Sequence, residues 1–310
     1  MKTEKYFKAL SDETRLRLFY LLIHYELNVN ELVLILQMGQ SRISRHLKVL
    51  SESGLLRYRR DAGFTYYQVR TDPQLKTLIK FVQDNLAEDP AREDLYRAQT
   101  IIRERKNETR RFFNQIAEHW ERLKKDILGE VDISRTVSEN VPPANRAVDI
   151  GCGTGELMLY LLPKTDKVIG VDHSAQMLNM ARLKLEAHQF SDRVDLRLGE
   201  MEHLPLRDKE VEVATMSMVL HHSPLPQAGI EEANRVLLPG GILVIADFAK
   251  HSREDIRRKY GQTWLGFEQE DIQTWLEAAG FELQKNESHP VRHGLFVNIF
   301  RSVKSSEAQA

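Results

Sequence analysis

The sequence predicts an α/β protein in which a small, mainly helical N-terminal region precedes a larger region built on a doubly wound parallel sheet. Between residues 5 and 70, short amphipathic helices are followed by an alternating hairpin. From Arg146 onward, apolar strand-like runs alternate with helical segments, which is the order expected of a sheet with helices on both faces. At 310 residues the chain is long enough for two hydrophobic cores.

The N-terminal region combines three predicted helices with a hairpin. The second and third helices are expected over residues 28–38 and 40–51, with apolar residues at helical spacing and a glycine after each. Residues 55–60 then alternate in polarity and predict a strand. After a short turn, residues 64–69 predict the second strand of a hairpin. Three helices followed by a hairpin describe a winged helix-turn-helix.

In such a unit the third helix enters the major groove of DNA and the hairpin contacts the flanking backbone. Here the third helix is polar and basic on one face, and three arginines flank the hairpin turn. Each residue alone is typical of a solvated surface, but together they favour DNA contacts. The candidates are Gln40, Ser41, Arg42, Ser44, Arg45, His46, Arg57, Arg59 and Arg60. Residues 1–70 hold twelve Lys/Arg against seven Asp/Glu, although the whole chain has a net charge of -1.

A helical connection is predicted between the two regions. Pro73 opens a helix from Gln74 to Ala87 whose apolar stripe is typical of a dimer interface. Residues 91–127 are strongly charged and helix-prone, with no Gly or Ser, so they predict a connecting helix rather than a flexible linker. The predicted domains are 1–90 for DNA binding and dimerisation, 91–130 for the helical linker, and 131–310 for the α/β region.

The most specific motif of the chain runs from Ala147 to Gly155, where an apolar strand enters a glycine-rich turn before a helix. The glycines allow a sharp turn and close approach of the backbone to a ligand. The next strand ends in Asp172, a carboxylate that can accept hydrogen bonds from both hydroxyls of a ribose. An NAD site shares this pattern, but Glu156 stands where a pyrophosphate would approach. A cationic sulfonium ligand with an ammonium group fits the spacing better.

Residues 146–290 resemble a class I S-adenosylmethionine-dependent methyltransferase of the small-molecule type, similar to the ubiquinone-biosynthesis enzymes. The matching segments are VDIGCGTG at 148–155, GVD at 170–172, GEMEHLP at 199–205, VLHH at 219–222 and RVLLPGG at 235–241. The resemblance implies a Rossmann-like fold that binds S-adenosylmethionine or S-adenosylhomocysteine.

By position in the matching segments, this resemblance assigns residues to the amino acid, ribose and adenine parts of the ligand. Asp149 with Gly151, Gly153 and Gly155 would hold the amino acid end, Asp172 the ribose, and Glu200 with Met201 the adenine. The family usually has Asp where Glu200 stands. Met177 and Ser217 are further candidate lining residues, with a core-facing position as the alternative for Met177.

The sequence is compatible both with catalysis of methyl transfer by this region and with ligand binding alone. His221 and His222 follow a strand end near the expected methyl group and are candidate bases, but the family often carries such histidines without that role. Residues 112–120 resemble the flap that covers the ligand in this family. Anchoring of a helix by Phe113 and Trp120 explains the same pattern.

Cys152 is the single cysteine, so the chain has no intramolecular disulfide and no cysteine-based metal site. An arsenic methyltransferase needs several thiols for its substrate, and we do not expect that activity. Residues 1–10 lack the apolar core of a signal peptide, and the apolar run at 18–23 is too short to span a bilayer. We expect a cytoplasmic protein without a membrane partner.

Residues 7–69 resemble the ArsR family of bacterial repressors. The matching segments are LSDETRLRL at 10–18, QSRISRHLKVL at 40–50, GLL at 54–56 and YY at 66–67. The resemblance implies a homodimer that reads two half-sites of a double-stranded DNA operator. Many members sense metals through cysteines before the recognition helix. Residues 26–32 contain no thiol and the predicted dimer helix no histidine, so we expect no metal.

The combination resembles a subgroup of ArsR-type proteins fused to a methyltransferase-like domain, whose members are associated with the methionine and S-adenosylmethionine cycle and respond to S-adenosylhomocysteine. This implies a ligand-responsive repressor, with residues 91–127 as the candidate two-state element. Two alternatives stay open. One is an active methyltransferase of a small-molecule acceptor with a regulatory helix-turn-helix, and the other is an enzyme with a vestigial one.

Overall fold

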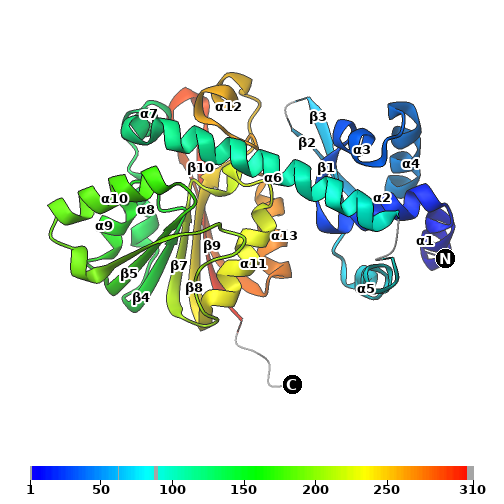
Figure 1. Cartoon of the computed structure of the whole chain (residues 1–310). Helices are drawn as coiled ribbons and strands as arrows, with labels where there is room; N and C mark the ends of the chain where they lie inside the picture. The colour runs from blue at the N-terminus through cyan, green and yellow to red at the C-terminus, as the bar shows by residue number, and fades with distance from the viewer. Residues whose placement is uncertain (1, 62, 87–89, 306–310) are drawn as a thin grey trace. The chain divides into compact units, whose positions relative to one another are not determined.

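The computed structural model describes residues 2–61, 63–86 and 90–305 (Figure 1). The chain divides into two compact units, Met1–Arg105 and Lys106–Ala310. One continuous helix, α6 (Ala91–Ile116), supplies residues to both units. The division therefore falls inside the segment for which the sequence predicts a connecting helix.

The first unit is a helical cluster closed by a small antiparallel sheet. Its helices are α1 (Lys2–Leu10), α2 (Glu13–His24), α3 (Val29–Leu36) and α4 (Gln40–Ser53). Its strands are β1 (Leu27–Asn28), β2 (Leu56–Asp61) and β3 (Phe64–Val69), in the order β1-β3-β2. The predicted helices and hairpin are present, and β1 is an additional strand that the sequence pattern does not predict.

Local signals and a shared core explain these helices. The side chain of Asp12 caps α2 by accepting from Arg15 N at 3.0 Å, and Asn28 with Glu31 forms a capping box on α3. Apolar residues of three helices are fully buried together; they are Leu18, Phe19, Leu21, Leu22, Leu32, Ile35, Ile43, Leu47 and Leu50. Burial of this face leaves the opposite face of α4 to solvent.

The helix predicted over 74–87 begins with a 3-10 turn, Pro73–Leu75, and continues as α5 (Lys76–Asn85). Ala87 lies outside the described residues. The first part of α6 is held on this unit by a two-bond ion pair, in which Arg17 donates to both carboxylate oxygens of Asp94 at 2.7 and 2.9 Å. Asp94 is fully buried. A buried carboxylate needs such a partner, so the pair fixes the rotation of the helix on its core.

The second unit is built on a seven-stranded sheet of order β6-β5-β4-β7-β8-β10-β9. Its strands are β4 (Ala144–Ile150), β5 (Thr165–Asp172), β6 (Val194–Leu198), β7 (Val211–Ser217), β8 (Leu237–Phe248), β9 (Phe281–Pro290) and β10 (Phe296–Lys304). The first five are parallel to one another, and β10 runs antiparallel to β8 and β9. The predicted doubly wound sheet is confirmed, and two antiparallel strands, β10 and β9, close it.

Two limits of this sheet differ from those that the apolar pattern of the sequence predicts. The pattern predicts a strand over 241–248 and a frayed polar tail over 302–310, but β8 begins at Leu237 and residues 302–304 continue β10. Lys304 is buried there, and its Nζ donates to the carbonyls of Asn234 and Leu237 at 2.7 and 2.8 Å. These bonds satisfy the ammonium group inside the fold, which hydropathy alone does not predict. Residues 306–310 lie outside the described residues.

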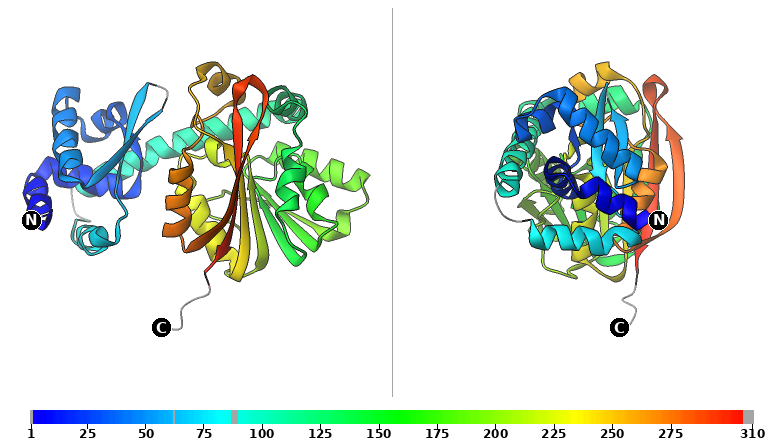
Figure 2. Two further views of the ribbon diagram at one scale, coloured as in Figure 1. Left: turned by 180° about the vertical axis from the view of Figure 1, so that it is seen from behind. Right: turned by 90° about the vertical axis from the view of Figure 1, so that its right-hand side faces the viewer.

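Helices cover both faces of this sheet (Figure 2). They are α7 (Trp120–Leu128), α8 (Ile133–Glu139), α9 (Glu156–Leu161), α10 (Ala175–Ala187), α11 (Pro226–Val236), α12 (Glu254–Tyr260) and α13 (Gln269–Ala278). Right-handed crossovers put α9 and α10 on one face and α11 on the other. No helix in the described part of the chain has both the length and the apolar character needed to cross a membrane.

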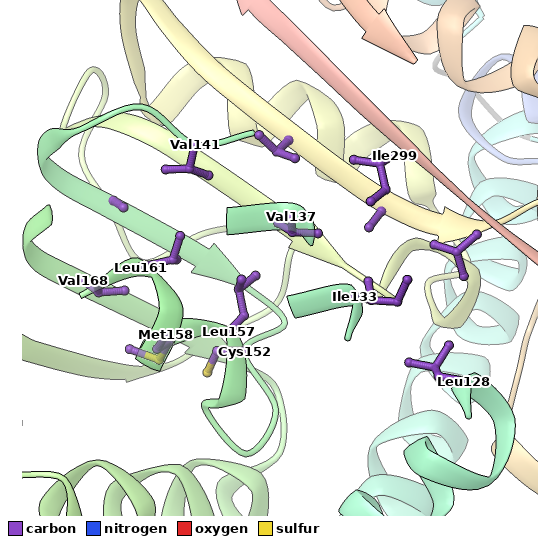
Figure 3. Close-up of a cluster of buried hydrophobic side chains, with 14 of the residues drawn as sticks. Leu128, Ile133, Val137, Val141, Cys152, Leu157, Met158, Leu161, Val168 and Ile299 are labelled. Carbon is purple, nitrogen blue, oxygen red and sulfur yellow. The ribbon is translucent and has the colours of Figure 1, made fainter. Parts of the chain in front are cut away.

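One hydrophobic cluster supports the glycine-rich turn. Figure 3 shows Ile133 and Val137 of α8 beside Leu157, Met158 and Leu161 of α9, with the side chain of Cys152 among them. Because Cys152 packs in this cluster, it anchors the backbone of the turn to the core.

Candidate ligand pocket and nucleic-acid interface

A pocket of the second unit lies at the carboxyl ends of β4, β5 and β7. The strand order reverses between β4 and β7, and in open α/β sheets such a switch point is where ligands bind. Eight residues that the sequence predicted for the ligand line this pocket; they are Asp149, Gly151, Gly153, Asp172, Met177, Glu200, Met201 and Ser217. Gly155, the ninth, does not line it. A Cβ there would lie 3.2 Å from Cβ of Ala181, so that glycine serves packing against α10.

The glycine-rich turn needs glycine for two different reasons. Gly151 has φ +72°, and a Cβ built on it would lie 2.3 Å from Cγ2 of Val219. Gly153 has φ +53°, and its nearest neighbour would be Nε1 of Trp120 at 3.8 Å, across the pocket wall. The first glycine therefore permits tight packing, and the second leaves bare backbone facing the pocket.

Asp172 joins the glycine-rich turn to the start of α10. Its Oδ2 accepts from Gly153 N at 2.9 Å, and its Oδ1 accepts from Ser174 N at 2.8 Å. Burial raises the pKa of this carboxyl despite these two bonds. Each carboxylate oxygen keeps a second lone pair, so the group can still accept hydrogen bonds from a ligand hydroxyl.

Asp149 is buried at the end of β4, in the wall of the same pocket. The hydroxyl of Thr215 donates to its Oδ1 at 2.8 Å. Burial raises the pKa of Asp149 to about 7, because desolvation disfavours the carboxylate more than this hydrogen bond and the charge of Lys124 favour it. A ligand cation would restore the lost charge compensation, so the site is suited to an ammonium group.

Residues of α6 and the turn after it form one wall of the pocket. Lys106, Asn107, Thr109, Arg110 and Phe113 line it, followed by Trp120. Phe113 and Ala117 also pack with Met177 of α10 in a small apolar cluster. Packing of Phe113 in this cluster agrees with the anchoring interpretation of residues 112–120. Phe113 also lines the pocket, and the flap interpretation stays a prediction. Met177 likewise packs in the core and lines the pocket.

Lys106 connects α6 to two carboxylates of the loop after β6. Its Nζ donates to Oε2 of Glu200 at 2.7 Å and to Oε2 of Glu202 at 3.0 Å. Glu202 is buried, and its Oε1 accepts from the hydroxyl of Ser223 at 2.6 Å. The nearby carboxylates raise the pKa of Lys106, although burial opposes the shift, so the ammonium stays charged.

The two predicted histidines are placed differently. His222 lines the pocket, whereas His221 does not. Nδ1 of His221 lies 2.7 Å from Oδ1 of the buried Asp247, which fixes that ring behind the pocket wall. Nδ1 of His222 lies 3.0 Å from Gly261 O, and burial lowers its pKa well below the ordinary value. His222 is therefore neutral, with Nδ1 carrying the proton and Nε2 able to accept one.

Sequence reasoning missed several lining residues, of which Lys106 and Arg110 on α6 and Lys124 on α7 are basic. Lys106, Arg110 and Phe113 are spaced by four and three residues, so helical periodicity extended N-terminally from the aromatic segment would have put them on one face. Lys124 pairs with Glu156, the residue that argued against a dinucleotide. No group of three or more residues among those described could hold a metal ion.

The first unit presents a polar face on α4. Gln40, Ser41, Arg42, Ser44 and Arg45 are all exposed, opposite the buried apolar residues of the same helix. This is the geometry in which a recognition helix reaches base edges and phosphates.

Other predicted DNA contacts are engaged within the unit. Arg59 donates to both carboxylate oxygens of Glu26 at 2.5 and 3.0 Å, and Nη2 of Arg57 donates to Gln68 Oε1 at 2.6 Å. Nδ1 of His46 lies 3.6 Å from Oδ1 of Asp12, and burial lowers the pKa of its ring. Arg60 is exposed on the wing. The exposed α4 residues and Arg60 are thus the better placed part of the predicted set.

Comparison with known families agrees with both units. Residues 12–58 match the family of the bacterial regulatory protein arsR, and residues 148–245 match the methyltransferase domain family. The chain joins an ArsR-family helix-turn-helix to a class I methyltransferase domain. The glycine-rich turn and the end of β5 lie inside the matched part of the methyltransferase domain, and α4 lies inside the matched part of the ArsR-family unit.

Individual relatives that are methyltransferases match part of this chain. A demethylmenaquinone methyltransferase of Desulfitobacterium hafniense is 33% identical over 128 residues, which are 40% of this chain and 49% of that protein. An arsenite methyltransferase of Halobacterium salinarum is 31% identical over 149 residues, 45% of this chain and 38% of that protein. The chain thus spans about half the length, or less, of these relatives. The crystal structure of the cyclase SpnF has a similar fold, with a TM-score of 0.51, 21% identity and coverage of 58% of this chain and 86% of that one.

Proposed function

We propose that the chain is a DNA-binding transcriptional repressor of ArsR type whose methyltransferase domain binds S-adenosylhomocysteine or S-adenosylmethionine and thereby controls operator binding. The observation that carries the proposal is the convergence of eight predicted ligand residues on one pocket, in a chain that also presents an exposed recognition helix. Genes of the methionine and S-adenosylmethionine cycle are the proposed targets.

The pocket chemistry supports an adenosyl amino acid ligand. Asp149 supplies a buried carboxylate for an ammonium group, and the bare backbone at Gly153 leaves room for an amino acid tail. Asp172, at the end of β5 beside β4, offers lone pairs for ribose hydroxyls. Glu200 follows β6, the strand on the other side of β5. These residues fit both the methylated and the demethylated ligand, because the two share these groups.

The DNA-binding unit supports a homodimer on a two-fold operator. Phe7 of α1 and Phe81 of α5 are 64% and 62% exposed, although both are large apolar side chains. Apolar rings on exposed helix faces are the surfaces that a symmetric partner covers. A dimer would present two α4 helices to successive major-groove half-sites.

Helix α6 supports ligand control of DNA binding. Its residues up to Arg105 are bound to the first unit, through Asp94 and through an ion pair between Arg105 and Glu31. Its residues from Lys106 onward line the pocket of the second unit. A ligand that binds one arrangement of α6 better than another shifts the balance between them. We therefore propose α6 as the two-state element within residues 91–127.

The test is a titration of S-adenosylhomocysteine and S-adenosylmethionine against a complex of the full chain with an operator selected from random double-stranded DNA. We expect a change of at least fivefold in operator affinity for the wild type and none for Asp172→Ala. If wild-type affinity stays within twofold at ligand concentrations that saturate the pocket, ligand control of DNA binding is refuted.

His222 favours a second candidate function, methyl transfer to a small-molecule acceptor. Its ring is neutral, and Nε2 can accept a proton from an acceptor hydroxyl or carbon acid beside the pocket. The test measures isotope transfer from methyl-labelled S-adenosylmethionine over an acceptor panel, with the wild type, His222→Gln and Asp172→Ala. Transfer by the wild type that falls at least a hundredfold in His222→Gln supports catalysis. No transfer to any acceptor counts against it.

A further inference from the structure

Lys106 lies at the centre of a hydrogen-bonded chain in the wall of the pocket. The hydroxyl of Ser223 accepts from Leu225 N at 2.9 Å and donates to Oε1 of Glu202. Lys106 Nζ then bridges Oε2 of Glu202 and Oε2 of Glu200. Glu202 is therefore fixed at both oxygens, whereas Glu200 is fixed at one.

The remaining oxygen of Glu200 is available to a ligand. Among the residues that the structure describes, none donates a hydrogen bond to its Oε1. The Glu200 side chain is 44% exposed, so without a partner it would turn into water. Arg110 also lies near enough to stabilise the charged form of Glu200, so the carboxylate stays ionised, and its free oxygen suits a donor group and repels an acceptor.

The position of Glu200 indicates which part of the ligand it meets. Gly199 N donates to the carbonyl of Asp172 at 3.0 Å, so Glu200 follows directly on a residue bonded to the end of β5. A ribose held by the Asp172 carboxylate would carry its base outward along the sheet, toward β6. Two acidic side chains line the pocket on that side, and Glu200 is the more exposed of them, whereas Glu202 is buried.

We propose that Lys106 is a positioning residue for purine recognition: it holds Oε2 of Glu200 so that Oε1 faces the 6-amino group of an adenine. The inference rests on the proposed function only for the adenosyl ligand, not for its effect on DNA. Lys106 belongs to α6. The same ammonium group therefore positions Glu200 for the adenine and ties the part of α6 from Lys106 onward to the loop after β6.

Removing the ammonium group changes the site in a specific way. The buried Glu202 keeps its bond from Ser223, but it loses the cation that separates it from Glu200. Repulsion between the carboxylates then drives the more exposed Glu200 outward. The loss concerns the adenine amine alone, whereas a collapsed pocket would lose affinity for every ligand of similar shape.

The experiment is calorimetry of the full chain with S-adenosylhomocysteine and with its 6-oxo analogue, S-inosylhomocysteine, which puts an acceptor where the amine stood. The proteins are the wild type, Lys106→Met, Lys106→Arg and Glu200→Gln, with Lys106→Met/Glu200→Gln as the double variant. Arg111→Met is the matched control, because Arg111 is an exposed cation of the same helix that does not line the pocket.

We expect the wild type to prefer the 6-amino ligand at least tenfold. Lys106→Met should lose about tenfold in affinity for it while its affinity for the 6-oxo analogue changes less than threefold. Lys106→Arg should recover most of the preference, Arg111→Met should match the wild type, and the double variant should bind no more weakly than Glu200→Gln alone.

Equal losses for both ligands in Lys106→Met, or an unchanged preference, would overturn the role of Lys106. Operator binding is measured separately on the same proteins. A wild type that shows the ligand preference without any effect on DNA would refute the regulatory function and leave the role of Lys106 supported. A wild type that binds neither compound would refute both.

Discussion

The hydroxyl of Thr215 donates to Oδ1 of Asp149 at 2.8 Å, and it is the hydrogen bond that holds this carboxyl group at the end of β4. Its effect is smaller than that of burial, which raises the pKa of Asp149 to about 7. The charge of the pocket therefore changes within the physiological pH range.

The first prediction is that a ligand with an ammonium group binds more weakly as the pH falls below about 7. Below this value Asp149 is protonated in the free protein, and the ligand loses its anionic partner. Affinity should fall by nearly tenfold per pH unit for one linked proton. Calorimetry between pH 5.5 and 8.5 measures the slope. Asp149→Asn should bind weakly with little slope, and an unchanged slope in this variant would contradict the assignment.

The same shift acts on the stability of the ligand-free protein with the opposite dependence on pH. The folded-state pKa of Asp149 lies above its unfolded value of about 3.9. The stability that this group contributes is therefore fully present below the unfolded pKa and is lost as the pH rises through about 7. Comparing the melting temperatures of the wild type and Asp149→Asn across this range isolates the contribution.

Gly151→Ala is expected to destabilise the methyltransferase domain and abolish ligand binding. The variant combines a left-handed backbone, which costs about 1–2 kcal/mol for other residues, with a Cβ placed 2.3 Å from Val219. Gly240→Ala is the matched control, because Gly240 has φ +75° and a Cβ added there would have no atom within 4 Å. Chemical denaturation should show a larger loss for Gly151→Ala; equal losses would mean that the contact with Val219 relaxes.

Arg17→Met is expected to destabilise the first unit by about 3 kcal/mol, because it leaves the buried Asp94 without its two-bond partner. Arg97, with Nη1 3.5 Å from Oδ1 of Asp94, compensates in part. An exposed pair, Arg70 with Asp72, provides the comparison, and Arg70→Met should change stability by less than about 1 kcal/mol. Urea unfolding measures both. Similar losses would show that the Asp94 pair is not important for folding.

Arg45 and Arg59 are both predicted DNA contacts, but we expect their substitutions to have different effects. Arg45 is exposed on α4, so Arg45→Ala should weaken operator binding by about tenfold at an unchanged melting temperature. Arg59 is bound to Glu26, so Arg59→Ala should lower the melting temperature first. Fluorescence anisotropy at several salt concentrations, with melting curves beside it, checks both. A loss of DNA affinity in Arg59→Ala without a change in stability would assign that arginine to DNA instead.

The sequence predicted the parts of the fold that follow local rules. The glycine turn at 151–155 and the carboxylate at Asp172 sit at strand ends, and parallel strands bring their carboxyl ends to one edge of the sheet. Apolar periodicity likewise placed the buried face of α4, including Ile43 and Leu47. In these segments the local pattern and the tertiary environment agree.

Prediction failed where the partner lies far away in the sequence. Lys106 looks like one more charge on a solvated helix, because Glu200 and Glu202 follow it by more than ninety residues. Arg59 resembles a basic wing residue in the sequence, but in the fold its guanidinium is bound to Glu26. Strand β1 has only two residues, too few for an alternating pattern, and its pairing with β3 depends on the fold around it.

The burial of Cys152 within the glycine-rich turn gives the native chain a built-in reporter of access to the pocket. Burial raises the pKa of this thiol well above its ordinary value, so little thiolate exists to react with an alkylating reagent. Cys152 is 7% exposed and lines the pocket, so modification should be slow, and its rate measures how often the pocket admits the reagent. The sequence has no second thiol to compete. The increase in protein mass over time, measured by mass spectrometry, therefore follows the modification of Cys152 without an introduced label.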